Sequence, residues 1–118
     1  MRQYQTRSYG GYSKYKNNRV STPYGEFDSG KEYNRFLVLY SKERSGKIKD
    51  LQRQVSFELV PAQKGPTRSE RAVRYVADFV YVQDGKTVVE DVKGYKTPEY
   101  VIKRKLMLSV HGIEIKEV

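Results

Sequence analysis

The segment RYVADFVYVQDGKTVVEDVK spans residues 74–93 and contains two runs rich in β-branched and aromatic residues. The pair Asp84-Gly85 separates the two runs and is typical of a two-residue type I′ hairpin turn. We therefore predict two antiparallel strands, which cover residues 74–82 and 86–93.

A two-residue turn also fixes the pairing register of the hairpin. Counted back from the turn, Asp78 lies directly opposite Asp91, and Val76 lies opposite Lys93. Opposed residues have Cβ atoms about 4.5–5.5 Å apart, and residues two apart on a strand share a face. We therefore expect Asp78, Asp91 and Lys93 together on one face, and Glu90 on the other.

The two opposed carboxylates lie on a sheet surface that is otherwise largely apolar. Like charges in that position destabilise a fold unless a cation offsets them. Either a divalent metal ion or an Asp–Lys–Asp salt-bridge cluster that includes Lys93 would do so, and the hairpin alone leaves both alternatives open.

The sequence on either side of the hairpin predicts two helices and two further strands. Ser29 is a suitable N-cap and Glu32 stands at the third helical position, which together make a capping box. Thr97 caps the second helix and Gly112 ends it. The expected elements are helices over residues 30–44 and 98–110 and strands over 51–60 and 113–118, and the expected core stripe of the first helix is Tyr33, Phe36, Leu37 and Tyr40.

The order helix, three strands, helix, strand predicts an α/β domain over residues 26–118, with a mixed central sheet flanked by helices. The last strand is expected parallel to the third, because a right-handed helical crossover joins them. Residues 1–25 contain five basic side chains, five tyrosines and no acid. Such a segment buries too little surface to offset its ordering entropy, and we expect a flexible basic, Tyr-rich arm.

Composition limits the possible functions. The chain has 118 residues with 23 Lys and Arg against 14 Asp and Glu, and the net charge of +9 favours a polyanionic partner, most often nucleic acid. A basic surface that is merely solvated is the alternative. Cysteine is absent and His111 is the only histidine, so thiolate and His-rich metal sites are excluded. Any metal must be held mainly by oxygen, which favours Mg²⁺ or Mn²⁺.

The longest apolar runs are far shorter than the ~20 residues of a membrane-spanning helix. The basic N-terminus is not followed by the apolar stretch of a secretory signal. From these two observations we expect no membrane association and a cytoplasmic location.

Asp78 followed by Asp91-Val92-Lys93 resembles the D…(D/E)-x-K core of the PD-(D/E)XK nuclease superfamily. The order αβββαβ is similar to its restriction-endonuclease-like core, and Glu32 matches the acidic residue on the first core helix. More closely, the chain resembles small phage and prophage proteins placed in that superfamily. The segments that carry this resemblance are residues 27–29, 31–32, 51–54, 57–59, 75–79 and 89–94.

The resemblance implies a catalytic set of Glu32, Asp78, Asp91 and Lys93. Asp78 and Asp91, with the Val92 backbone carbonyl, would bind Mg²⁺ or Mn²⁺, and Lys93 would orient or deprotonate the attacking water. Glu32 would act through a metal-bound water or a second ion, although the capping box gives it a purely structural alternative. Asp91 departs from the superfamily, in which Glu is the commoner residue at this position.

The same resemblance implies a Mg²⁺-dependent DNA endonuclease, selective for branched DNA as Holliday junction resolvases are, with a role in phage recombination, replication or packaging in the host cytoplasm. A non-catalytic DNA-binding protein that keeps the nuclease fold is the alternative. Paired cuts need two sites, so we expect a homodimer, with Val38 and Leu39 as candidate contacts. Gln54 and Glu58 are expected either in solvent or at the site. The basic residues expected to contact DNA are Arg7, Lys14, Lys16, Arg19, Lys64, Arg68, Lys96, Lys103 and Arg104.

Overall fold

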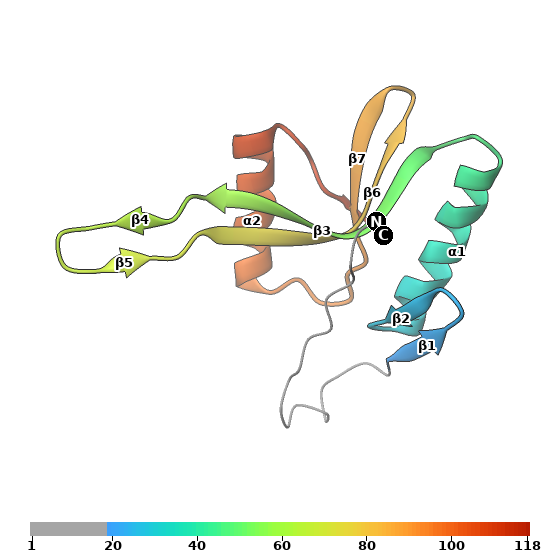
Figure 1. Ribbon diagram of the computed structural model, residues 1–118, viewed down its shortest axis with the longest axis horizontal. Helices are drawn as coiled ribbons and strands as arrows, with labels where there is room; N and C mark the ends of the chain where they lie inside the picture. Colours follow the sequence, from blue (N-terminus) through green and yellow to red (C-terminus); the bar gives the residue numbers. More distant parts are fainter. Residues whose placement is uncertain (1–18) are drawn as a thin grey trace.

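A computed structural model describes residues 19–118 of the chain (Figure 1). Arg7, Lys14, Lys16 and the rest of residues 1–18, which form most of the expected arm, lie outside the described residues. The elements are β1 (Val20–Thr22), β2 (Gly25–Phe27), α1 (Gly30–Arg44), β3 (Lys49–Val60), β4 (Gln63–Lys64), β5 (Ser69–Glu70), β6 (Val73–Gln83), β7 (Lys86–Asp91), α2 (Pro98–His111) and β8 (Lys116–Glu117).

The central sheet has four strands in the order β3-β6-β7-β8. The first three form an antiparallel meander, and β8 runs parallel to β7 after the α2 crossover, so the mixed α/β architecture is confirmed. The structure adds two ribbons of two strands each, β1–β2 and β4–β5. β7 ends at Asp91 rather than residue 93, and β8 is shorter than the predicted strand.

The β6–β7 turn is the predicted type I′ turn, with φ values of 53° at Asp84 and 77° at Gly85. The ladder starts with Gln83 opposite Lys86 and continues to Phe79 opposite Glu90. The predicted register is therefore confirmed up to the residue next to Asp78.

The expected core stripe of α1 is wrong at one position. Leu37 is 38% exposed, whereas Leu39 is fully buried. The buried residues of the helix are Glu32, Phe36 and Leu39. They also follow a helical spacing, but the buried face begins at Glu32 and not at Tyr33, so the helix is rotated relative to the prediction. Leu39 lies in the core and is therefore wrong as a dimer contact, while Val38 is exposed.

The core consists of two clusters, one under each helix. The buried residues of β6 divide between the two clusters: Tyr75 and Ala77 pack with Met107 of α2, whereas Phe79 and Tyr81 pack with residues of α1. The change of partner falls at Asp78, which therefore lies where the two clusters meet.

Residues 19–25, the end of the expected arm, are part of the folded structure. β1 pairs with β2, and Arg19 forms ion pairs with Glu26 at 2.8 Å and Asp28 at 3.3 Å. Tyr24 in the connecting turn packs against Phe36, with ring centroids 5.4 Å apart. This ribbon is therefore attached to the start of α1.

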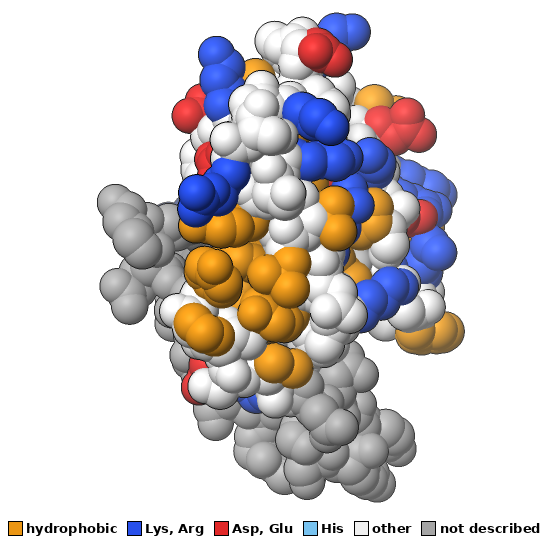
Figure 2. Space-filling model, turned by 90° about the vertical axis from the view of Figure 1, so that its right-hand side faces the viewer, with side chains coloured by type: hydrophobic (Ala, Val, Ile, Leu, Met, Phe, Trp, Pro, Cys, Tyr) orange, Lys and Arg blue, Asp and Glu red, His pale blue; other side chains and the backbone are white. Residues whose placement is uncertain are grey.

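Figure 2 shows apolar side chains gathered on the side of the molecule where α1 lies. The exposed apolar residues on α1 and the β1–β2 turn are Tyr24, Leu37 and Val38. Neither helix within residues 19–118 has the length and apolarity needed to cross a membrane.

Candidate functional site

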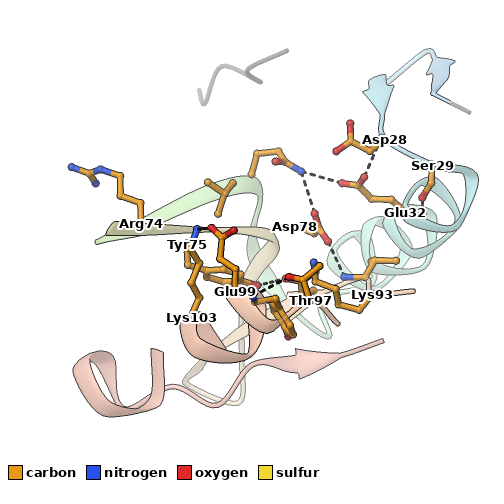
Figure 3. Close-up of a pocket in the computed structure, with 15 residues that line it drawn as sticks. Asp28, Ser29, Glu32, Arg74, Tyr75, Asp78, Lys93, Thr97, Glu99 and Lys103 are labelled. Atoms are coloured by element: carbon orange, nitrogen blue, oxygen red, sulfur yellow. Dashed lines mark hydrogen bonds and ion pairs between the residues drawn. The ribbon is translucent and has the colours of Figure 1, made fainter. Parts of the chain in front are cut away.

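A cavity of ≈ 390 Å³ opens between the N-terminal ends of α1 and α2, beside the middle of β3 and β6 and the end of β7 (Figure 3). Its wall includes all four residues of the expected catalytic set, together with the Val92 backbone. The residues that line it include Asp28, Glu32, Gln54, Arg74, Tyr75, Asp78, Asp91, Val92, Lys93, Tyr100 and Lys103.

Glu32 enters the cavity from the first turn of α1 and is 3% exposed. The backbone N–H of Glu32 donates to Ser29 Oγ at 3.1 Å, which is half of the expected capping box. The Glu32 carboxylate accepts from the backbone N–H of Asp28 at 3.1 Å, one residue earlier than in the standard box. The cap therefore holds this carboxylate at the cavity wall.

Gln54 connects the carboxylates of α1 and β6. Its Nε2 donates to Glu32 Oε2 at 3.1 Å and to Asp78 Oδ1 at 3.4 Å. Gln54 has a φ of 55° and is buried, so the backbone leaves the regular β conformation where the side chain enters the site. Of the two expected alternatives for this residue, the structure shows the site position. Glu58 lies in solvent and pairs with Arg74 at 3.3 Å.

The charge balance of the cavity is negative. Burial, with the nearby charges of Glu32 and Asp91, raises the pKa of Asp78 to about 8, while the Val92 N–H opposes the rise. Burial also raises the pKa of Glu32, and the charge of Asp28 adds to that rise. A cation bound between these carboxylates would offset the cost of burying their charges and the repulsion between them.

Asp91 and Lys93 are held by aromatic side chains. Tyr75 donates its hydroxyl to Asp91 Oδ2 at 2.6 Å. Lys93 Nζ lies 3.7 Å from Asp91 Oδ1 and 4.5 Å from the centroid of the Tyr100 ring. The ammonium therefore lies between a carboxylate and a π-face, and both attract its positive charge.

The backbone of Val92 faces Asp78. Val118 N donates to Asp91 O at 3.0 Å, and Lys93 N donates to Val118 O at 3.4 Å, so the neighbours of Val92 pair with the end of the chain. Val92 N donates the other way, to Asp78 Oδ2 at 2.8 Å. Because the N–H and C=O of one extended residue point to the same side, the Val92 carbonyl is also turned toward Asp78.

The available ligand atoms fit a hard cation, because Asp78, Asp91 and the Val92 carbonyl all offer oxygen. Within residues 19–118, no group of three or more acidic, imidazole or thiol side chains stands at metal-binding spacing. A set of two carboxylates and a carbonyl suits Mg²⁺, which keeps several of its water ligands.

Residues 12–116 match the family model described as "Protein of unknown function (DUF1064)". The chain belongs to the DUF1064 family. No curated protein and no solved structure matches it. The matched range contains every residue that lines the cavity, so the site described here is part of the DUF1064 domain.

Glu90 does not line the cavity of this DUF1064 domain, as its strand position predicts. It is fully buried and accepts from Arg35 Nε at 2.8 Å and Nη2 at 2.6 Å. Tyr81 also donates its hydroxyl to this carboxylate, and Lys116 Nζ lies 3.9 Å away. These partners lower the pKa of Glu90 despite its burial. Sequence reasoning missed this network, because Arg35 and Glu90 are 55 positions apart.

The described basic residues that were expected to bind DNA are spread over the DUF1064 domain. Of those within residues 19–118, only Lys103 lines the cavity, where it pairs with Glu99 at 3.0 Å. Arg104 and Lys96 both pair with Glu117, at 2.9 and 3.8 Å. The other described members are Arg19 beside β1 and Lys64 and Arg68 at the β4–β5 ribbon.

Sequence reasoning also missed Tyr75, Tyr100 and Arg74 at the cavity. Strict alternation along the strand would place Tyr75 on the face opposite to Asp78. The change of partner along β6 brings it to Asp91 instead. Nothing in the local pattern indicates such a change.

Proposed function

We propose that this DUF1064 protein is a Mg²⁺-dependent DNA endonuclease, and that its preferred substrate is branched DNA. The observation that carries the proposal is the convergence of Glu32, Asp78, Asp91 and Lys93 on one cavity. The negative charges of these carboxylates are only partly balanced by positive groups in the cavity, although the whole chain has a net charge of +9. A bound cation at that point and a basic surface around it are the requirements for holding a phosphodiester.

Asp78, Asp91 and the Val92 carbonyl would hold the ion, and Mn²⁺ would fit the same oxygens. When bound, the ion supplies positive charge to the scissile phosphate and to the leaving oxygen. Lys93 is aimed by Asp91 and Tyr100, and it would orient or deprotonate the water that attacks phosphorus. Both oxygens of Glu32 already accept hydrogen bonds, so this residue would act through a bound water.

The decisive experiment is the cleavage of supercoiled plasmid with and without Mg²⁺. The Asp91→Asn variant is expected to lose at least about 100-fold of the activity, since one ligand and the partner of Lys93 change together. Asp84→Asn is the matched control, because it makes the same substitution on the same hairpin and Asn-Gly also favours the type I′ turn. Undiminished cleavage by Asp91→Asn would contradict the proposal.

Branch selectivity is tested separately with duplex, flap, Y-shaped and four-way substrates. Paired cuts across a junction need two cavities, and a two-fold homodimer would supply them. The exposed apolar residues Leu37 and Val38 of α1 are the candidate contacts. Light scattering with and without a four-way junction measures the oligomeric state of the protein. A monomer that nicks duplex and junction equally would argue against branch selectivity.

A non-catalytic DNA-binding protein is the second candidate. It is favoured by the contacts that Asp91 already makes with Tyr75 and Lys93, which satisfy part of its charge without a metal. This candidate predicts salt-dependent DNA binding that does not respond to Asp91→Asn, and no strand cleavage in Mg²⁺ or Mn²⁺.

A further inference from the structure

Residues 61–72 join β3 to β6 as a two-stranded ribbon that projects away from the rest of the domain (Figure 1). Within it, β4 pairs with β5, and Gly65 N donates to Arg68 O at 2.8 Å. Residues 61–71 are all exposed, and the ribbon has no large apolar side chain. A two-stranded hairpin with nothing to pack against is at best marginally stable in water. The ribbon therefore adds nothing to the packing of the domain's core, and the core does not explain why the ribbon is there.

The ribbon carries an excess of positive charge. It contains three basic residues, Lys64, Arg68 and Arg71, and one acidic residue, Glu70. The Arg68–Glu70 pair is 4.0 Å long with side chains 76% and 57% exposed, and such pairs contribute little. Within residues 19–118, no ion pair engages Lys64 or Arg71. Because Lys64 pairs with Ser69 and Glu70 pairs with Gln63, the lysine and the acid lie on opposite faces.

The ribbon is a continuation of the strands that build the cavity. β3 carries Gln54 and β6 carries Asp78, and both side chains line the cavity. Arg74, at the base of the ribbon, lines it as well (Figure 3). A partner held at the cavity would therefore meet a basic ribbon of fixed direction.

We propose that this ribbon lies in a groove of duplex DNA beside the phosphodiester held at the cavity. The proposal rests on the DNA endonuclease function proposed above. The major groove of B-DNA admits a two-stranded β-ribbon, and the ribbon's basic side chains are complementary to the phosphates that border it. Its small and polar residues, with no apolar patch, fit a wet and charged interface.

The length of the ribbon sets its reach along DNA. Ser69 lies nine positions before Asp78 in the chain. At about 3.3 Å per residue they span at most about 30 Å. B-DNA rises about 3.4 Å per base pair, so this reach corresponds to about nine base pairs. The protein should therefore need about nine base pairs of duplex on one side of the bond that it cuts.

The first variant removes the ribbon without touching the cavity. Val60 pairs with Val73, so Asn-Gly can replace residues 61–72 as a two-residue turn between them. End-labelled duplexes of decreasing length are cleaved in Mg²⁺, and the distance from each cut to the nearer end is determined. The full chain is expected to leave about nine base pairs uncut at one end. The shortened variant is expected to cut nearer to that end.

A second variant removes only charge: Lys64→Ser, Arg68→Ser and Arg71→Ser together. If all three contact phosphate, the slope of log K against log salt falls by about 2.7 for a duplex bound in Ca²⁺. The matched control is Lys47→Ser, Lys49→Ser and Lys86→Ser, which removes the same charge from exposed positions at the far ends of β3 and the β6–β7 hairpin. Its slope should change by less than about 0.5.

The outcomes separate this proposal from the function on which it rests. An unchanged end distance and an unchanged salt slope would overturn the ribbon proposal and leave the endonuclease standing. The proposal would also be overturned if removing the ribbon's charges lowered the salt slope for duplex RNA but not for duplex DNA. If the full chain neither binds nor cuts DNA, both proposals fail.

Discussion

Glu90 and Asp91 are neighbours on β7, and both are almost completely buried, yet their surroundings are opposite. Glu90 has a bidentate arginine, a tyrosine hydroxyl and a lysine around it, and its pKa is lowered. Asp91 shares its cavity with Asp78 and Glu32, where burial and like charge raise the pKa of Asp78. The difference distinguishes an acid whose charge is fully paired within the fold from a group of acids whose like charges lie close together.

The largest effect is expected on catalysis. Asp78→Asn should lower Mg²⁺-dependent plasmid cleavage by at least about 100-fold, because it would remove one of the proposed metal ligands. Glu58→Gln, an exposed acid on the adjacent strand, should leave the rate within about two-fold. Initial rates at several Mg²⁺ concentrations measure this, and equal loss in both variants would contradict the role of Asp78.

The next effect is expected on stability, from the other acid. Glu90→Gln leaves the Arg35 charge without its partner and should lower the free energy of unfolding by about 3 kcal/mol. The matched control is again Glu58→Gln, whose exposed pair with Arg74 should contribute less than about 0.5 kcal/mol. Urea denaturation of both variants provides the comparison, and similar midpoints would show that the buried pair is not structural.

A third effect is expected from pH. The pKa of Asp78 is 3.8 ordinarily and about 8 in the folded protein, so the folded state binds more protons between these values. The free energy of unfolding of the metal-free protein should therefore fall as the pH rises from about 4 to about 8. Glu32, whose pKa is also raised, acts in the same direction.

Asp78→Asn should reduce this fall, and Mg²⁺ should restore the melting temperature of the unmodified protein at pH 8. Thermal melts from pH 5 to pH 8, with and without Mg²⁺, test both expectations. A melting temperature that rises with pH in the metal-free protein would contradict the raised pKa.

The smallest effect is expected from Tyr75→Phe, which removes the hydroxyl that donates to Asp91. The loss of one hydrogen bond to a charged group should cost about 1.5 kcal/mol of stability. Tyr33→Phe, on a half-buried ring of α1, is a control for the substitution itself. An unchanged urea midpoint for Tyr75→Phe would show that Asp91 does not depend on this donor.

The sequence predicts one half of the site better than the other. The Asp84-Gly85 turn fixes the register, so the approach of Asp78 to Asp91 follows by counting. No comparably tight turn joins β3 to β6, and the position of Gln54 opposite Asp78 could therefore not be counted. Arg35, the partner of Glu90, and Gln54, the partner of Asp78, come from α1 and β3, and local patterns do not encode these contacts.

The rotation of α1 shows a second limit. Residues 36–40 are five consecutive apolar residues, so the hydrophobic period fits more than one face of the helix. The polar contacts of Glu32 and Arg35 select the face that is buried. Likewise, the Gly65-Pro66 pair is typical of a loop, and the extended pairing on either side of it has no apolar alternation to reveal it.

The left-handed backbone at Gln54 also matters for protein engineering. A non-glycine residue at a φ of 55° costs on the order of 1 kcal/mol, which glycine would recover. Glycine would, however, delete the amide that joins Glu32 to Asp78. Two hydrogen bonds to carboxylates contribute more than this strain costs, so selection for heat resistance would retain Gln54 and with it the connection between the two acids.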